Sequence, residues 1–594
     1  MKRVRINKLL FLASCILLSS TVFGQSKADT LNQKHNEIVT IYGSSRPVTG
    51  EALKIGRKPE APALEMLTVP VIAGFSDIKV PTTIQLKTIR LSSSVKTYRP
   101  AQQSWKNLLT LGFGSRISPL LEYFYSGGRS KHYLLTVHLL HHSSFLNIKN
   151  YLPSPYTHSK AGVSYDKYFR YHVLAIRGDY RINTNRYYGF NTKGDTVAYN
   201  KNDASLKQYY QVARFGVQYS SSYRNNYKLN HLFRANTYYL SDKHGMSETN
   251  VHFDFDLHKG FKVSKIFNHQ QLGLEGNFDY FKNEATALPA GYQLKEDYYA
   301  RIFPYFDARY GIFSFRAGLN FEWLKTDNAK LHFYPYLHVN VNVAPGVFSF
   351  FGGIDGGLKK NSYLNLSREN PYLGSVQNNF RWENTKFEVF GGFKGNIARR
   401  FGFEVRAGYR KFDNMAYFDH IGSFLMEPFL NSQGLYTPFK NEYYVFYANG
   451  HVFNLSGSLT YANTPNLDMW LKGAYNSYTL NDWLKPLYKP LFKMSLGASY
   501  QIKKIKPWVE VYFMDKRWAK SQTSWYPMSS AVYLDNGFYY LNRYFDVNVG
   551  MEYHIDKQLT GFIRGTNLLN KHYYRFDEYP VAGLEIMVGV RYRF

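Results

Sequence analysis

The sequence predicts an all-β protein, a transmembrane antiparallel β-barrel of about 22 strands. Apolar and polar side chains alternate through many segments of roughly ten residues, as expected for strands with one lipid-facing and one hydrated face. The mean hydropathy is −0.39, and only one long apolar run is present, at the N-terminus, which excludes a helical membrane protein. A barrel is compatible with this low value because its two faces average out.

The final segment, 584–594, shows the alternation most clearly. Only Met587 interrupts it, and the last residue is aromatic. We predict a closing barrel strand here, whose aromatic ending also serves as part of the signal for insertion by the barrel assembly machinery. The residues predicted to carry this assembly signal are Val588, Val590, Tyr592 and Phe594.

Several other segments repeat the same two-residue period. Many are longer than the roughly five or six residues usual in globular sheets, and they begin or end in aromatic residues. Their polar faces carry ionic side chains such as Arg316 and Glu404, which are costly in a dry core but not in a hydrated lumen. These features favour a barrel over a soluble β-sandwich. The clearest segments are 313–323, 401–409, 492–502 and 545–555.

The connections between the expected strands fall into two classes. Short ones, such as Gly127-Gly128 and Tyr310-Gly311, are typical of periplasmic turns. Three longer ones, predicted to be outside loops, carry many aromatic residues. Such loops often meet a ligand or partner, although packing at the lipid rim explains the aromatics equally well. The long connections are 359–376, 412–441 and 524–537.

The N-terminal region predicts export. Residues 1–24 have the basic start, apolar centre and small-residue end of a cleaved signal peptide, so the mature chain is expected to begin at Gln25. A lipoprotein signal at Cys15 is the less favoured alternative because the apolar run continues beyond it. The proline-rich region 25–104 is expected to be a periplasmic or lumenal segment, followed by the barrel over 105–594.

Charge and cysteine content narrow the function classes. The formal net charge is +30. An exported chain meets no nucleic acid, so we expect this charge to complement outer-membrane lipid and lipopolysaccharide, or to line a lumen that attracts anions. The only cysteine, Cys15, lies in the expected signal peptide, which excludes disulfides and thiol chemistry from the mature protein. No cofactor is predicted.

The C-terminal sequence resembles that of TonB-dependent receptors. The resemblance rests on NLLNKHYY at 567–574, YPVAG at 579–583 and the closing aromatic strand, in this order. The stretch NDWLKPLYKP at 481–490 is similar to a linker in such barrels of the Bacteroidota. The resemblance implies energised import through a barrel filled by an N-terminal plug, with a short TonB box that binds TonB. A β-prone segment similar to such a box is formed by Glu37, Ile38, Val39, Thr40 and Ile41.

The sequence departs from this family before the barrel. The region 25–104 is shorter than the family's plug and lacks its Gly- and Arg-containing signatures, so we expect a reduced or absent plug. Three hypotheses for the function remain open. The first is a receptor or transporter for a large nutrient at the cell surface. The alternative is a plugless barrel that acts as a structural or assembly partner of an outer-membrane lipoprotein or another barrel. The third is an outer-membrane enzyme, and a simple porin is the remaining possibility.

An outer-membrane enzyme is the least supported class. No base-oriented nucleophile stands out, and no catalytic residue is assigned. His138 and His142 share one strand face while His141 lies on the other, so they are not expected to converge on a metal. A second set shares one face but is strung too far along a strand to bind one ion, and no metal site is predicted. This set is His252, Asp254, Asp256 and His258.

Overall fold

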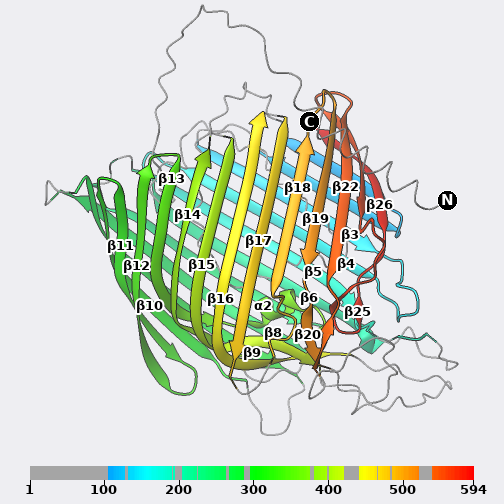
Figure 1. The fold of residues 1–594 in the computed structure, drawn as a ribbon, viewed down its shortest axis with the longest axis horizontal. Helices are drawn as coiled ribbons and strands as arrows, with labels where there is room; N and C mark the ends of the chain where they lie inside the picture. The colour runs from blue at the N-terminus through cyan, green and yellow to red at the C-terminus, as the bar shows by residue number, and fades with distance from the viewer. Residues whose placement is uncertain are drawn as a thin grey trace, which may run out of the picture. The chain divides into compact units, whose positions relative to one another are not determined.

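The protein is described by a computed structural model. Its strands form one closed antiparallel barrel of 22 strands, in which each strand pairs with its neighbour in the chain (Figure 1). The barrel closes where β1 (Asn107–Gly114) pairs with β26 (Glu585–Arg593), from Leu108 opposite Arg593 to Gly114 opposite Met587. The predicted fold class and strand number are confirmed. The structure describes residues 105–127, 132–189, 191–193, 204–223, 225, 227–262, 267–286, 294–374, 380–397, 400–420, 441–464, 466–481, 485–520 and 538–594.

The other wall strands follow in chain order, with bounds as listed here. In the first half they are β2 (Ser118–Ser126), β3 (Tyr133–Ser144), β4 (Tyr156–Tyr168), β5 (His172–Arg186), β6 (Lys207–Ser221), β7 (Asn230–Asp242), β8 (Met246–Phe261), β9 (His269–Ala285), β10 (Asp297–Tyr310) and β11 (Phe313–Lys325). In the second half they are β12 (Ala329–Ala344), β13 (Phe348–Lys360), β14 (Trp382–Ile397), β15 (Phe401–His420), β16 (Tyr443–Thr464), β17 (Leu467–Leu480), β18 (Phe492–Tyr500), β19 (Ile505–Met514), β22 (Tyr544–His554) and β23 (Leu559–Thr566). Outside the wall lie a 3₁₀ turn (Ala204–Leu206), helix α2 (Tyr363–Glu369), the pair β20 (Arg517–Lys520) and β21 (Phe538–Leu541), and the pair β24 (Tyr574–Phe576) and β25 (Tyr579–Pro580).

The two faces of the wall differ as the sequence predicts. The outer face carries large apolar side chains that remain exposed in the barrel, whereas the inner face carries paired ions. An exposed apolar belt of this extent needs a covering of lipid tails. The described residues contain no helix long and apolar enough to span a membrane. Outward side chains that are more than a third exposed include Phe215, Leu272, Leu319, Phe333, Phe350, Leu459, Phe545 and Val588.

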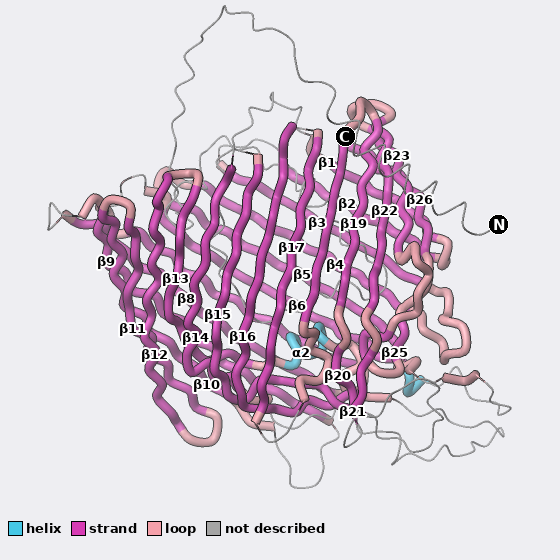
Figure 2. Tube along the Cα trace, viewed as in Figure 1, coloured by secondary structure: helices cyan, strands magenta, loops and turns pink. Residues whose placement is uncertain are grey.

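The longest connections all lie at one end of the barrel. At that end several exceed ten residues, as at 361–381 and 567–584, whereas at the other end none exceeds eight, as at 169–171, 311–312 and 398–400. Short turns face the periplasm and long loops face outward in bacterial barrels, so we name these the periplasmic and extracellular ends. Figure 2 shows α2 and the small strands β20, β21 and β25 at the extracellular end.

One predicted boundary is wrong. Residues 412–420 were expected to start an outside loop, but they extend β15, which ends at His420. A bulge between Phe412 and Met415 shifts the pairing register with β16, and Asn414 adopts a left-handed φ of 55°. Since the shift breaks the regular alternation of apolar and polar residues, the two-residue pattern does not predict the part of β15 that follows the bulge. The predicted segments 1–24 and 25–104 lie outside the described residues, and these boundaries stay predictions.

Candidate functional site

The extracellular loops meet one another across the mouth of the barrel. We call this set the loop lid, and it comprises the described parts of four connections: 187–189, 361–374, 485–491 and 567–584. Tyr372, from the loop between β13 and β14, stacks on Tyr579, from the loop between β23 and β26, with ring centroids 3.5 Å apart. The strands β14 to β19, β22 and β23 lie between these two loops in the wall. The contact therefore reaches across the opening and not merely between neighbours.

Tyrosine hydroxyls hold the lid together by donating to backbone carbonyls. Tyr187 donates to Leu373 at 3.0 Å, and Tyr188 donates to Pro580 at 2.8 Å. A loop carbonyl is a buried acceptor that must be satisfied, and tyrosine supplies both the donor and a large apolar ring. Burial raises the pKa of Tyr188 to about 12, so the hydroxyl keeps its proton at neutral pH. Two further bonds of this kind run from Tyr443 to Asp577 and from Tyr579 to Asn441.

Helix α2 is anchored to the wall by one carboxylate. Glu248, on β8, is fully buried, and its oxygens accept from the backbone N–H groups of Tyr363 at 2.6 Å and Leu364 at 3.0 Å. These N–H groups are the unpaired donors of the first helical turn, which a carboxylate satisfies well. The Tyr363 hydroxyl donates to Asp242 on β7 at 2.8 Å. The side chain of Ser362 caps the helix by accepting from the N–H of Asn365.

The other end of α2 is held by an ion pair. Lys489 Nζ lies 2.6 Å from a Glu369 oxygen, and both side chains are mostly buried. Burial lowers the pKa of Lys489, but the Glu369 carboxylate together with Tyr478 and Glu383 more than offsets this and holds the pKa above its ordinary value. The lysine is therefore charged, and the pair ties the 481–490 stretch to the loop that contains α2.

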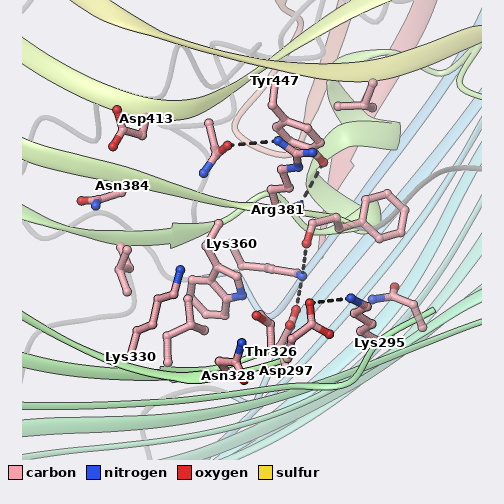
Figure 3. Close-up of a pocket in the computed structure, with 18 of the residues that line it drawn as sticks. Lys295, Asp297, Thr326, Asn328, Lys330, Lys360, Arg381, Asn384, Asp413 and Tyr447 are labelled. Carbon is pink, nitrogen blue, oxygen red and sulfur yellow. Dashed lines mark hydrogen bonds and ion pairs between the residues drawn. The ribbon is translucent and has the colours of Figure 1, made fainter. Parts of the chain in front are cut away.

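A cavity of about 1020 Å³ lies beside the lid at the extracellular ends of β9 to β16 (Figure 3). Two thirds of its lining residues are polar, and Phe380 and Tyr447 belong both to this lining and to the packing of the lid. A cavity of this size accommodates a ligand larger than most metabolites. The polar lining residues are Asn283, Lys295, Asp297, Thr326, Asp327, Asn328, Lys330, His332, Lys360, Arg381, Asn384, Asp413, Asn414 and Tyr447.

Most charges in this cavity are already paired. Lys360 pairs with Asp297, and Lys295 lies 2.5 Å from Asp327. Arg381 donates to Asn414 at 3.4 Å and lies 5.4 Å from the Tyr447 ring centroid. The Lys386 amine lies 2.8 Å from Asp413. Each of the three cavity carboxylates thus has a cation.

Two of the cavity cations, Lys330 and Arg381, have no carboxylate partner in the described part of the chain. Lys330 projects into the cavity in Figure 3. The Arg381 side chain makes only a neutral hydrogen bond and a ring contact among the described residues. The cavity consequently offers two cations to a ligand, which favours acidic groups.

Ion pairs on the lumenal face of the wall lie below the cavity. Arg316 contacts Asp307 on the adjacent strand at 2.8 Å and Glu275, two strands away, at 3.3 Å, and Arg406 contacts Glu388 on the adjacent strand at 2.5 Å. We assign none of these residues a catalytic role.

The histidines singled out in the sequence lie as their parity predicts. His138 bonds Glu122 at 2.9 Å on the inner face, and His141 bonds Ser159 at 2.9 Å on the outer face. His252 contacts Asp254 and Asp279, and His258 contacts Asp256. The described residues form no group of three or more side chains that could hold a metal ion.

The remaining predicted site residues divide between the two ends of the chain. The TonB-box-like residues Glu37 to Ile41 lie outside the described residues. Val588, Val590, Tyr592 and Phe594 are 40 to 54% exposed on the outer face of the last strand, and their role as an assembly signal stays a prediction.

Sequence reasoning missed the residues that build the lid. Glu248 and Asp242 sit near strand ends, where nothing local marks them as anchors for a helix more than a hundred residues away. The density of aromatics in the long loops was the available signal, and the lid shows that the described ones pack on each other.

No family model matches the sequence, and no curated protein matches it. Solved structures do match. The siderophore receptor PirA from Acinetobacter baumannii has a TM-score of 0.60 at 11% identity, over 83% of this chain and 81% of that chain. The FrpB iron transporter from Neisseria meningitidis has a TM-score of 0.58 at 11% identity, over 83% and 82%. FpvA from Pseudomonas aeruginosa, bound to a heterologous pyoverdine, has a TM-score of 0.57 at 13% identity, over 82% and 72%. The barrel has the fold of TonB-dependent siderophore receptors.

Proposed function

We propose that this chain is an outer-membrane receptor that binds a large nutrient at the cell surface and passes it into the barrel. The observation that carries this proposal is the polar cavity of about 1020 Å³ at the extracellular end of a receptor-type barrel. Fold alone does not set function, but a cavity at the extracellular end with two cations free of carboxylate partners in the described part of the chain supports binding over a purely mechanical role. We assign the protein no catalytic activity.

Iron–siderophore complexes are the first ligand class to test. The similar solved structures include a siderophore receptor and an iron transporter. Lys330 and Arg381 suit a ligand that carries acidic groups. Binding of ferric complexes and other large acidic nutrients to the purified barrel can be measured by calorimetry, with Lys330→Glu as the variant. Lys149→Glu is the matched control, because Lys149 is exposed at the same barrel end and lies outside the cavity lining.

Transport is proposed to need TonB through the TonB-box-like residues 37–41, which we delete together with the five residues that follow them. We expect deletion of 37–46 to abolish growth on the nutrient while binding to the purified protein stays unchanged, because binding and energised transport are separate steps. A deletion of 51–60, equal in length, is the control and is expected to retain both. Growth that survives the first deletion would count against TonB-driven import. The proposed reduction of the plug, in a barrel proposed to be of the Bacteroidota type, would then explain why TonB is not needed.

The alternative is a plugless structural or assembly partner in an outer-membrane complex. The loop lid favours this alternative, because it ties four loops together across the mouth with buried contacts. A stable lipoprotein or second barrel that copurifies from detergent-solubilised envelopes, together with no measurable nutrient binding, would support it over the receptor.

A further inference from the structure

Three neighbouring turns at the periplasmic end form a surface that the receptor function does not use. They connect β4 to β5, β6 to β7, and β8 to β9, and we call their described residues with the adjoining strand ends the rim cluster. The cluster combines exposed cations with aromatic rings. Its members are Arg170, Tyr171, His172, Tyr219, Tyr223, Tyr227, Lys228, His231 and Lys262.

Cations and rings link the three turns. Lys228 Nζ lies 5.0 Å from the ring centroid of Tyr223 and 5.3 Å from that of Tyr171, which belongs to the preceding turn. Arg170 lies 5.1 Å from the same Tyr171 ring. In the third turn, Lys262 lies 5.6 Å from the ring of Tyr227. These distances are within cation–π range, so the rings position the cations without neutralising them.

A stack of rings continues from the turns onto the wall. His172 stacks on Tyr219 at 5.3 Å and on His231 at 5.3 Å, and Tyr219 lies 5.5 Å from His231. Tyr219 is 38% exposed and shares its face of β6 with Phe215, which is 53% exposed. The stack therefore lies on the lipid-facing side, at the level where the wall meets its periplasmic turns. Nδ1 of His172 is buried and has no hydrogen-bond partner among the described residues.

The cluster has no acidic residue of its own. The sequence contains no Asp or Glu from 167 to 172, from 219 to 233, or from 257 to 274. Within the described part of the chain, none of Arg170, Lys228 and Lys262 forms an ion pair, and all three are exposed. The surface consequently attracts an anion, and its position on the outer face points to one held in the membrane.

We propose that the rim cluster binds the phosphate headgroup of an anionic phospholipid in the periplasmic leaflet. Arg170 and Lys228 flank the phosphate over the Tyr171 ring, Lys262 contacts a second charge or a neighbouring headgroup, and an acyl chain lies along Tyr219 and the wall above it. Basic pockets at the membrane surface bind anionic headgroups in this way, and a single chain in contact with wall aromatics holds the lipid in place. The proposal rests on the outer-membrane location and not on the nutrient.

The test compares lipid retention by two variants with equal charge loss. Wild-type protein, R170Q/K228Q/K262Q and the control K503Q/K504Q/K557Q are purified in mild detergent and titrated with phosphatidylglycerol or phosphatidylethanolamine under native mass spectrometry. The control removes three cations from two turns elsewhere on the same rim. We expect each of the three cations to contribute to lipid affinity as a single lysine does at an anionic membrane surface. Phosphatidylglycerol should therefore bind the first variant about 100-fold more weakly than the wild type, and the control less than about threefold more weakly.

A second variant separates ring contacts from charge alone. Y171L/Y223L keeps every cation, and we expect it to bind phosphatidylglycerol about tenfold more weakly because the rings no longer position Lys228. The heat-modifiable gel shift of each variant reports that the barrel is folded.

Three results would overturn the proposal. The first is an equal loss of phosphatidylglycerol affinity in R170Q/K228Q/K262Q and in the control. The second is equal binding of phosphatidylglycerol and phosphatidylethanolamine by the wild type. The third is an unaltered lipid affinity of R170Q/K228Q/K262Q while a periplasmic protein is lost from native membranes that contain this variant. A chain found outside the outer-membrane fraction would remove the location itself, whereas failure of nutrient binding leaves the lipid site standing.

Discussion

Replacing Glu248 with alanine tests whether the loop lid closes the barrel. The substitution leaves the N–H groups of Tyr363 and Leu364 without their acceptor and removes the bond that Tyr238 donates at 2.8 Å. Each buried donor left unsatisfied costs about 1 to 3 kcal/mol, and since bonds that act as a unit do not add fully, we expect a loss of about 3 to 5 kcal/mol. The cost falls on the lid because the ladder bonds of the wall are untouched. About 4 kcal/mol shifts the open-to-closed ratio roughly a thousandfold.

Single-channel conductance in planar bilayers measures this shift. We expect frequent openings for Glu248→Ala, together with faster proteolysis within 361–381, and an unchanged heat-modifiable gel shift. Glu284→Ala is the matched control, because Glu284 lies near the same barrel end, is 63% exposed and forms an ion pair with the partly exposed Lys282 rather than with a lid residue. If Glu248→Ala conducts and resists protease as the wild type does, Glu248 does not hold the lid and the argument for closure fails.

Three other outcomes are expected. Raising the pH should loosen the lid, because the pKa of an unfolded tyrosine is about 10 and that of Tyr188 is about 12. The neutral hydroxyl of Tyr188 therefore stabilises the lid fully below pH 10, and this contribution falls by about 1.4 kcal/mol per pH unit between pH 10 and pH 12. The loss should be seen as a rise in conductance that accompanies tyrosinate absorbance. Leu319→Arg should destabilise the barrel by about 2 to 4 kcal/mol in urea-dependent refolding into lipid, while the inward Ser314→Ala, which removes one long hydrogen bond, should cost less than half as much. Lys330→Glu should weaken binding of an acidic ligand about tenfold or more, which an unaltered calorimetric affinity would contradict.

The wall was predictable because its signal is local. In β11, the side chains from Phe313 to Trp323 alternate between lipid and lumen, so burial follows from the position of each residue in the strand. The same logic placed His138 and His141 on opposite faces. Where a bulge breaks the period, as before Met415, the prediction ended the strand too early.

The lid was not predictable because its contacts are not local. Tyr372 and Tyr579 meet only after the barrel has closed, and neither residue belongs to a repeating pattern that marks a partner. Tyr579 was noticed as part of the YPVAG motif at 579–583, where the resemblance indicated a turn. Its buried ring shows that the turn also carries a structural contact to the far side of the mouth.

The lid and the cavity share side chains, so a ligand in the cavity can affect whether the lid opens. Phe380 and Tyr447 line the cavity and pack against the lid core. A ligand shifts the lid only by binding its open and closed states with different affinity, so contacts with these shared rings are the route by which binding could loosen it. Hydroxyl-to-carbonyl bonds such as that from Tyr188 to Pro580 are neutral and buried, so added salt alone should not open the lid. Conductance that rises with ligand but not with salt would therefore favour the receptor, and a lid that stays shut with every ligand would favour the structural partner.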